Sequence, residues 1–228
     1  MSSNLDLYAK VEPLLGIEDA TLELHHYFLE ILKEKKPKTL IDVGCGRGAF
    51  IQKCKDLNIH AVGIDLSPKM IEDAKAKGLS VACRDIADTA GSYDVITAIF
   101  DVVNFIAPEN LSDFFSHVER LLSKDGFFIA DINTLYGFEE VADGVLAYDD
   151  EDKSLIVSAS YEDSKLQTDF TYFEKEDELY KKSSSTIMQY YYAIEALLEK
   201  STLELQVEMP IQLYGEEPDK AILIFKKV

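Results

Sequence analysis

The sequence predicts an α/β fold in which helices cover both faces of a mostly parallel β-sheet. Up to about residue 133, short apolar runs alternate with amphipathic segments, and the connections are short, as in βαβ units. Several of these runs end on an acidic residue, and a glycine-rich turn follows the first of them. Residues 134–190 instead contain extended segments separated by charged turns. The sequence therefore predicts a doubly wound sheet with a small antiparallel sheet inserted into it.

The first predicted strand, residues 39–43, runs into a turn that contains Gly44, Gly46 and Gly48, and a helix-compatible segment follows. Glycine is needed where a loop takes positive φ or lets a ligand approach the backbone. A strand, a glycine turn and a helix N-terminus together form a cradle for a nucleotide or an anion. The spacing fits the dinucleotide fingerprint G-x-G-x-x-G/A. A turn that only packs the helix is the alternative without a ligand.

The spacing of apolar residues and the positions of proline predict three helices. One ends before Pro37, and its spaced apolar residues are Leu22, Phe28, Leu29 and Leu32. The next begins at Pro68, where the missing N–H is tolerated, and runs through Lys75. A strongly amphipathic helix is predicted over residues 110–122.

Two further apolar runs end on acids. The run over residues 60–66 contains Asp65, about 20 residues beyond the glycines, where a carboxylate can accept hydrogen bonds from both ribose hydroxyls of an adenosine. The run over residues 79–86 contains Asp85. Asp65 supports a ribose without naming the cofactor, and Asp85 by itself could also cap a turn.

The chain resembles the class I S-adenosylmethionine (SAM)-dependent methyltransferases, in the small-molecule branch with the glycine and amino-sugar N-methyltransferases. The matching motifs are Asp42-x-Gly44-x-Gly46-x-Gly48, the FDVVNFI segment at residues 100–106 and a fifth strand at residues 124–133. One glycine of the family's fifth-strand pattern is replaced by Asp125. The resemblance covers residues 39–133 and implies a Rossmann-like sheet of seven strands in the order 3-2-1-4-5-7-6, with strand seven antiparallel.

The resemblance also implies a SAM site, whereas the cysteine pattern indicates no metal site. In the family, acids matching Asp65 and Asp85 hold the ribose and the adenine amino group, and the backbone matching Ile86 meets the ring. The implied cofactor-binding residues are Asp42, Gly44, Cys45, Gly46, Gly48, Asp65, Leu66, Met70, Asp85, Ile86 and Phe100.

Candidate catalytic residues are fewer, because methyl transfer depends mainly on aligning the nucleophile and excluding water. Asp101 is the first candidate, as a contact to substrate or to the methionine arm of SAM. Tyr8 is the second, since related enzymes fold an N-terminal tyrosine over the donor. His25, His26 and Tyr136 are weaker candidates, because such residues are commonly structural.

The segment over residues 134–190 is too long for a bare loop. Its extended stretches are residues 154–161, 166–174 and 178–188. By resemblance it is a β lid over the active site, inserted into a SAM-binding domain made of residues 1–133 and 191–228. A dimerisation sheet or a structural extension is the alternative. A helix over residues 192–200 and a strand pair at 203–207 and 221–226 complete the domain.

The composition of the chain limits the classes of molecule that it could bind. The chain has 228 residues, with 23 Lys and Arg against 42 Asp and Glu, for a formal net charge of −19. Such a surface repels phosphate backbones, so a nucleic-acid substrate is not expected. The three cysteines lack a C-x-x-C pair, and no apolar run has the length of a membrane span. We expect a cytoplasmic monomer or homodimer that acts on a small molecule and not at a membrane.

These features predict transfer of a methyl group from SAM to a small acceptor, most plausibly an amine nitrogen. A non-catalytic SAM-binding partner subunit is one alternative. An NAD-dependent oxidoreductase is another, but Tyr161-x-x-x-Lys165, with the spacing of short-chain dehydrogenases, falls in a predicted strand and turn and not in a helix.

Overall fold

The computed structural model describes residues 2–228, with side chains from residue 5 onward. Seven strands form the larger sheet: β1 (Thr39–Val43), β2 (His60–Asp65), β3 (Val81–Cys83), β4 (Tyr93–Ala98), β5 (Leu122–Asn133), β10 (Glu204–Ile211) and β11 (Lys220–Lys226). Their order is β3-β2-β1-β4-β5-β11-β10, and β11 runs antiparallel to both of its neighbours. The predicted Rossmann-like sheet and its strand order are confirmed.

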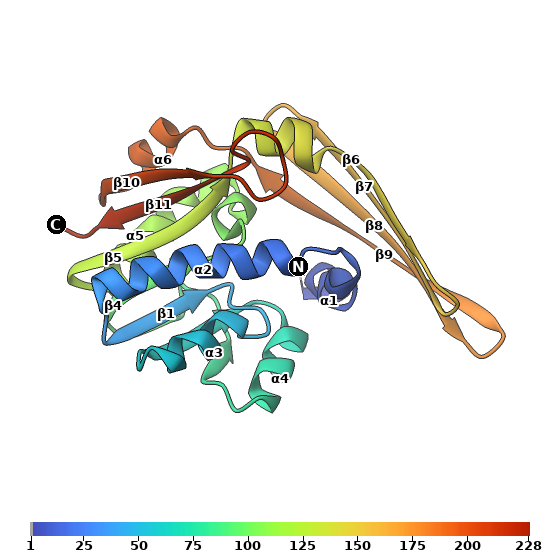
Figure 1. The fold of residues 1–228 in the computed structure, drawn as a ribbon, viewed down its shortest axis with the longest axis horizontal. Helices are drawn as coiled ribbons and strands as arrows, with labels where there is room; N and C mark the ends of the chain where they lie inside the picture. The colour runs from blue at the N-terminus through green and yellow to red at the C-terminus, as the bar shows by residue number, and fades with distance from the viewer. Residues whose placement is uncertain (1) are drawn as a thin grey trace.

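Helices cover both faces of this sheet (Figure 1). The helices of the chain are α1 (Ser2–Val11), α2 (Glu18–Lys35), α3 (Ala49–Asp56), α4 (Pro68–Ala76), α5 (Leu111–Leu121) and α6 (Ile194–Lys200). Leu40 and Val95 pack in one core with α2, α3 and α4, while the next residues along the strands, Ile41 and Ile96, pack in the other with α5 and α6. Because successive strand residues alternate between faces, the central strands are apolar on both sides.

Helix α2 buries Phe28 and Leu32 as predicted, but not Leu22. Its buried residues are Ala20, Leu24, His25, Phe28, Ile31 and Leu32. Leu22 is 53% exposed, because it lies half a turn from Ala20 and Leu24. The helix from Pro68 is confirmed, and the Ser67 hydroxyl accepts a hydrogen bond from the backbone N–H of Met70 at 3.3 Å. This is an ordinary N-cap.

A second, antiparallel sheet contains β6 (Gly144–Asp149), β7 (Lys153–Glu162), β8 (Lys165–Glu176) and β9 (Leu179–Tyr190), in chain order. Its hairpins extend away from the body of the molecule (Figure 1). The sequence predicted β7, β8 and β9 but missed β6, which is exposed along almost its whole length and lacks an alternating pattern. The sequence also missed α1, which packs on the inner face of this sheet through Leu7 and Val11.

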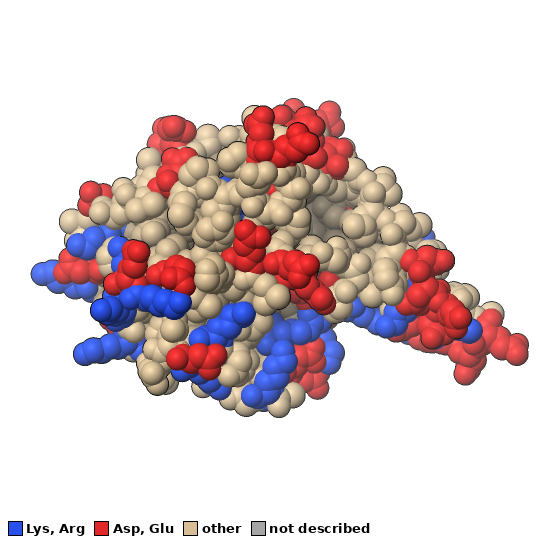
Figure 2. Space-filling model, viewed as in Figure 1, with Lys and Arg blue, Asp and Glu red and all other residues tan. Residues whose placement is uncertain are grey.

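Charge is unevenly distributed on the surface. Acidic side chains gather at the free end of the four-stranded sheet, and lysine and arginine side chains are more frequent on the lower half of the body (Figure 2). No described helix is long and apolar enough to span a membrane.

Candidate active site

The loop after β1 contains three glycines with positive φ, at 73° for Gly44, 52° for Gly46 and 74° for Gly48. A Cβ on Gly44 or Gly48 would lie 2.6 or 2.4 Å from a methyl group of a packed neighbour. A Cβ on Gly46 would meet only the Met70 sulfur, at 3.5 Å. Packing therefore explains the outer two glycines, whereas the middle one leaves open space beside the loop.

Asp42 lies in β1, just before this loop, and Cys45 lies within the loop. Asp42 is 3% exposed, and its Oδ1 accepts a hydrogen bond from the Thr97 hydroxyl at 2.7 Å. Burial raises the pKa of Asp42 to about 7, although the Thr97 hydrogen bond opposes this shift. Cys45 is also buried, with its sulfur beside Gly63. Both residues are buried, and their contact with SAM remains a prediction.

Asp65 lies at the end of β2, beside the loop. Its two carboxylate oxygens accept hydrogen bonds from the backbone N–H groups of Gly46 and Ser67, both at 2.8 Å. Burial raises the pKa of Asp65, while these hydrogen bonds lower it. Each oxygen keeps a further lone pair, so this half-buried carboxylate can still accept hydrogen bonds from a ligand.

The residues predicted for the adenine end lie on the same edge of the sheet. Asp65 pairs with Cys83 across β2 and β3, and Asp85 follows two residues later. Asp85 is exposed, and its Oδ1 accepts from the backbone N–H of Ala87 at 2.8 Å, as in a turn cap. Ile86 is buried. Of the other predicted residues, Met70 is buried and Leu66 is 48% exposed.

A strained turn follows β4. Phe100 and Asp101 both have φ of 67°, which is uncommon outside glycine. Their backbone N–H groups donate to the two carboxylate oxygens of Asp131, at 2.6 and 3.2 Å. Paired strained residues persist only where the surroundings hold them, and they cluster at functional sites.

A buried lysine, which was not predicted from the sequence, completes this cluster. Lys220 is 2% exposed, and its Nζ donates to Asp131 at 3.0 Å and to Asn133 at 2.8 Å. The ammonium also forms an ion pair with Asp101 and lies 5.1 Å from the centre of the Phe100 ring. Burial lowers the pKa of Lys220 to about 7 and raises that of Asp131 to about 7, whereas their pairing favours both charged forms.

A cavity of about 90 Å³ lies between this turn and the four-stranded sheet. It is lined by Tyr8, Phe100, Asp101, Phe105, Thr168, Phe170, Ile187 and Gln189. Tyr8 and Asp101, the two predicted catalytic residues, therefore line the same cavity. Burial is the main reason that the pKa of Tyr8 rises to about 12. The phenol is thus a neutral hydrogen-bonding group and not a base.

Arg47 links helix α1 to the glycine loop. This contact was not predicted from the sequence. The guanidinium forms ion pairs with Glu12 and Asp73 and donates to the backbone carbonyl of Ala9. This side chain comes from the loop itself, so the position of Tyr8 over the site is coupled to the loop.

The other candidates do not line the cavity. His25 is 6% exposed, and its ring lies 5.2 Å from that of Phe50 in the contact between α2 and α3. His26 is exposed. The hydroxyl of Tyr136 accepts from the backbone N–H of Glu216 at 3.1 Å. In the described part of the chain, no group of three or more His, Cys, Asp or Glu side chains could hold a metal ion.

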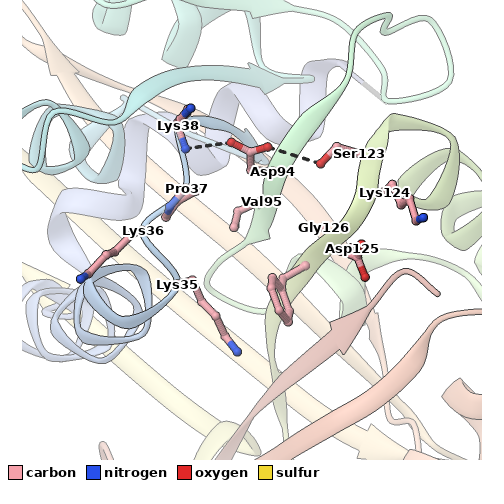
Figure 3. A pocket seen from close by; sticks show the side chains of 11 residues that line it. Lys35, Lys36, Pro37, Lys38, Asp94, Val95, Ser123, Lys124, Asp125 and Gly126 are labelled. Atoms are coloured by element: carbon pink, nitrogen blue, oxygen red, sulfur yellow. Dashed lines mark hydrogen bonds between the residues drawn. The ribbon is translucent and has the colours of Figure 1, made fainter.

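A larger cavity of about 310 Å³ lies at the opposite ends of the strands (Figure 3). Asp94 lies in its wall and accepts hydrogen bonds from the Lys38 backbone and the Ser123 hydroxyl. The amino groups of Lys36, Lys38 and Lys124 point in different directions and not toward a common centre (Figure 3). This cavity is therefore neither near the glycine loop nor arranged to hold an anion.

Comparison with known proteins agrees with this geometry. Residues 40–126 match the family model described as "Methyltransferase domain". The chain is 26% identical over 212 residues to a protein of Geobacillus sp. (strain WCH70) named as a methyltransferase, covering 83% of this chain and 85% of that protein.

Two solved structures share the fold. One is a SAM-dependent methyltransferase from Clostridium acetobutylicum ATCC 824, with a TM-score of 0.78 and 22% identity, covering 96% of both chains. The other is a sugar N-methyltransferase from Streptoalloteichus sp. ATCC 53650, with a TM-score of 0.77 and 15% identity, covering 100% of this chain and 94% of that one. At these identities the likeness establishes the fold, and the family match favours the methyl donor over a nicotinamide cofactor.

Proposed function

Because this chain belongs to the class I SAM-dependent methyltransferases, we propose that it transfers the methyl group of SAM to the nitrogen of a small amine. The cavity bounded by Asp101 and the four-stranded sheet carries this proposal. It brings together Tyr8 and Asp101, the two residues that the sequence predicted for catalysis.

The residues around the loop fit SAM. Gly46 has open space where a side chain would stand, and Asp65 offers a half-buried carboxylate beside it. We propose that Asp65 binds the ribose, and that Asp85 and the backbone of Ile86 bind the adenine. When bound, SAM supplies an electrophilic methyl group on a sulfonium centre.

The lining of the cavity suits an amine better than an anionic acceptor. Tyr8, Phe100, Phe105 and Phe170 are aromatic, Ile187 is aliphatic, and Asp101, Thr168 and Gln189 supply the polar atoms. No described lysine or arginine lines the cavity. Its size restricts the part of the acceptor that enters to a few heavy atoms. The net charge of −19 also favours the approach of a cationic amine and disfavours nucleic acid.

In the reaction, the neutral amine nitrogen forms a bond to the methyl carbon, and the carbon–sulfur bond breaks with its electron pair going to sulfur. The protein aligns the nucleophile and excludes water, which together lower the barrier. We propose that the Asp101 carboxylate accepts a hydrogen bond from the amine N–H and so orients the lone pair. We further propose that residues 134–190 act as a lid, because β8 and β9 form one wall of the cavity.

Incubation with methyl-labelled SAM and a cell extract separated by size and charge tests this function. We expect label in a small, basic fraction that gains the mass of one or more methyl groups. A parallel incubation with the Asp65→Ala variant controls for transfer by contaminating enzymes. Label only in RNA or in large protein would contradict a small acceptor, and label in no fraction would favour the non-catalytic alternative.

A further inference from the structure

The two oxygens of the Asp101 carboxylate have different surroundings. Oδ1 pairs with the buried ammonium of Lys220. Oδ2 faces the Gln189 amide, whose nitrogen is 3.5 Å away, so this contact is at the limit of a hydrogen bond. Asp101 and Gln189 both line the small cavity, whereas Lys220 does not. The lysine therefore acts on the cavity through two residues that line it, Asp101 as its ion-pair partner and Phe100, whose ring lies beside the ammonium.

The neighbouring acid does not perform the same task. Asp131 is fully buried, and its oxygens accept from the two backbone N–H groups of the strained turn and from Lys220 at 3.0 Å, but they do not face the cavity. Asp101 is the acid of this pair that reaches the cavity, and its side chain is 14% exposed. Lys220 is thus positioned to balance the charge of the one carboxylate that an acceptor would meet.

We propose that Lys220 is a positioning residue that neutralises Asp101, so that the cavity admits the acceptor as a neutral amine and releases the methylated, cationic product. This inference rests on the proposed function and names the charge state that the site selects. An unpaired carboxylate beside the acceptor would favour its ammonium form, which has no lone pair for attack. The same carboxylate would also retain a charged product.

Other titratable groups surround the pair but do not replace Lys220. Tyr8 from α1 lines the cavity as a neutral phenol, whose pKa is raised mainly by burial, with a small contribution from the charge of Asp65. Tyr214 lies near Asp131 and Asp219, and burial is the main reason that its pKa rises to about 12. The Asp219 carboxylate accepts from the backbone N–H groups of residues 213–215. Among the described residues, Lys220 is the lysine that forms an ion pair with Asp101.

A binding cycle with a permanent cation tests the proposal without knowledge of the natural acceptor. The probe is tetramethylammonium, and tert-butanol serves as an uncharged probe of similar shape. Both are titrated at about pH 6, where an unpaired carboxylate is ionised and Lys220, whose pKa is lowered by burial to about 7, is still an ammonium, in the presence and absence of S-adenosylhomocysteine. The proteins are the parent, Lys220→Met, Asp101→Asn and the double variant.

We expect Lys220→Met to bind tetramethylammonium about tenfold more tightly than the parent. Without the lysine, the negative charge of Asp101 is unbalanced, and its attraction for a cation in the cavity is large enough to change the affinity about tenfold. The double variant should return to the affinity of the parent, and tert-butanol should bind all four proteins alike. A purely structural role for Lys220 would instead alter the binding of both probes in the same direction.

The comparison between Asp101→Asn and the double variant keeps the test decisive if Lys220→Met alone fails to fold. Removing the lysine charge from Asp101→Asn should raise the tetramethylammonium affinity about tenfold as well, for the same Coulombic reason. Equal affinities within this pair, or an unchanged affinity in Lys220→Met, would overturn the proposal. A failure of the proposed function is seen separately, as absence of methylated product from the parent protein.

Discussion

The carboxylate of Asp65 accepts a hydrogen bond from the backbone N–H of Gly46 at 2.8 Å, which joins the end of β2 to the middle glycine of the loop after β1. The two residues are 19 positions apart in the sequence. The acid therefore holds the loop in place and, in our account, also binds the ribose of SAM. We therefore expect SAM binding to depend strongly on Asp65.

Replacing Asp65 with alanine should weaken SAM binding by about 1.5–3 kcal/mol, since hydrogen bonds to a charged group are lost. Isothermal titration calorimetry with SAM measures this difference. Asp56→Ala, at the far end of α3 and exposed, is the matched control and should bind SAM as the parent does. Parental affinity in Asp65→Ala would show that this carboxylate does not hold the cofactor.

Substitutions at Gly46 and Gly48 should separate an effect on SAM binding from an effect on the packing of the loop. Gly48→Ala should lower the free energy of unfolding by about 2–4 kcal/mol, from positive-φ strain and from overpacking against Leu79. Gly46→Ala has only the strain, about 1–2 kcal/mol, but should weaken SAM binding about tenfold because its methyl group occupies the open space beside the loop. Urea unfolding and calorimetry on both variants provide the comparison. If Gly46→Ala kept full SAM affinity, the open space would not be part of the cofactor site.

His25 should make folding stability depend on pH. Burial lowers its pKa from 6.5 to about 4, with a smaller contribution from the charge of Lys53. The neutral ring is therefore favoured in the fold, and its contribution is fully present above pH 6.5 and is lost as the pH falls toward 4. The shift corresponds to about 3 kcal/mol.

The measurement is the free energy of unfolding of the parent and of His25→Leu between neutral and acidic pH. The parent should lose more stability than the variant over this range. Asp42 and Asp131, whose pKa values are raised, change stability in the opposite direction, but they are present in both proteins and cancel in the difference. Parallel curves would mean that His25 is not buried as a neutral group.

Much of the fold could be predicted because each strand end carries a local signal. The glycines at 44, 46 and 48 and the acids Asp65 and Asp85 lie at the end of a short apolar run or just beyond it, so their meeting at one edge of the sheet follows from parallel order. Strand β6 could not be predicted, because its exposed residues do not alternate. Leu22 was wrongly expected on the buried face of α2, because more than one face of this helix carries apolar residues.

The site beyond the glycine loop was much harder to predict. Lys220 lies 119 residues from Asp101 in the sequence, and nothing near it indicates that it is buried. Gln189 and Thr168 reach the cavity only because the four-stranded sheet folds back against the turn after β4. Such contacts depend on tertiary structure, and one sequence provides no signal for them.

The most direct test of our account is to fill the small cavity. Thr168→Trp places an indole in it from β8, whereas Thr171→Trp places the same side chain on the opposite face of that strand. Methyl transfer to the labelled small-molecule fraction and SAM affinity are measured for both variants. We predict that Thr168→Trp binds SAM but transfers no methyl group, and that Thr171→Trp behaves as the parent. Normal transfer by Thr168→Trp would contradict the claim that the acceptor is methylated in this cavity.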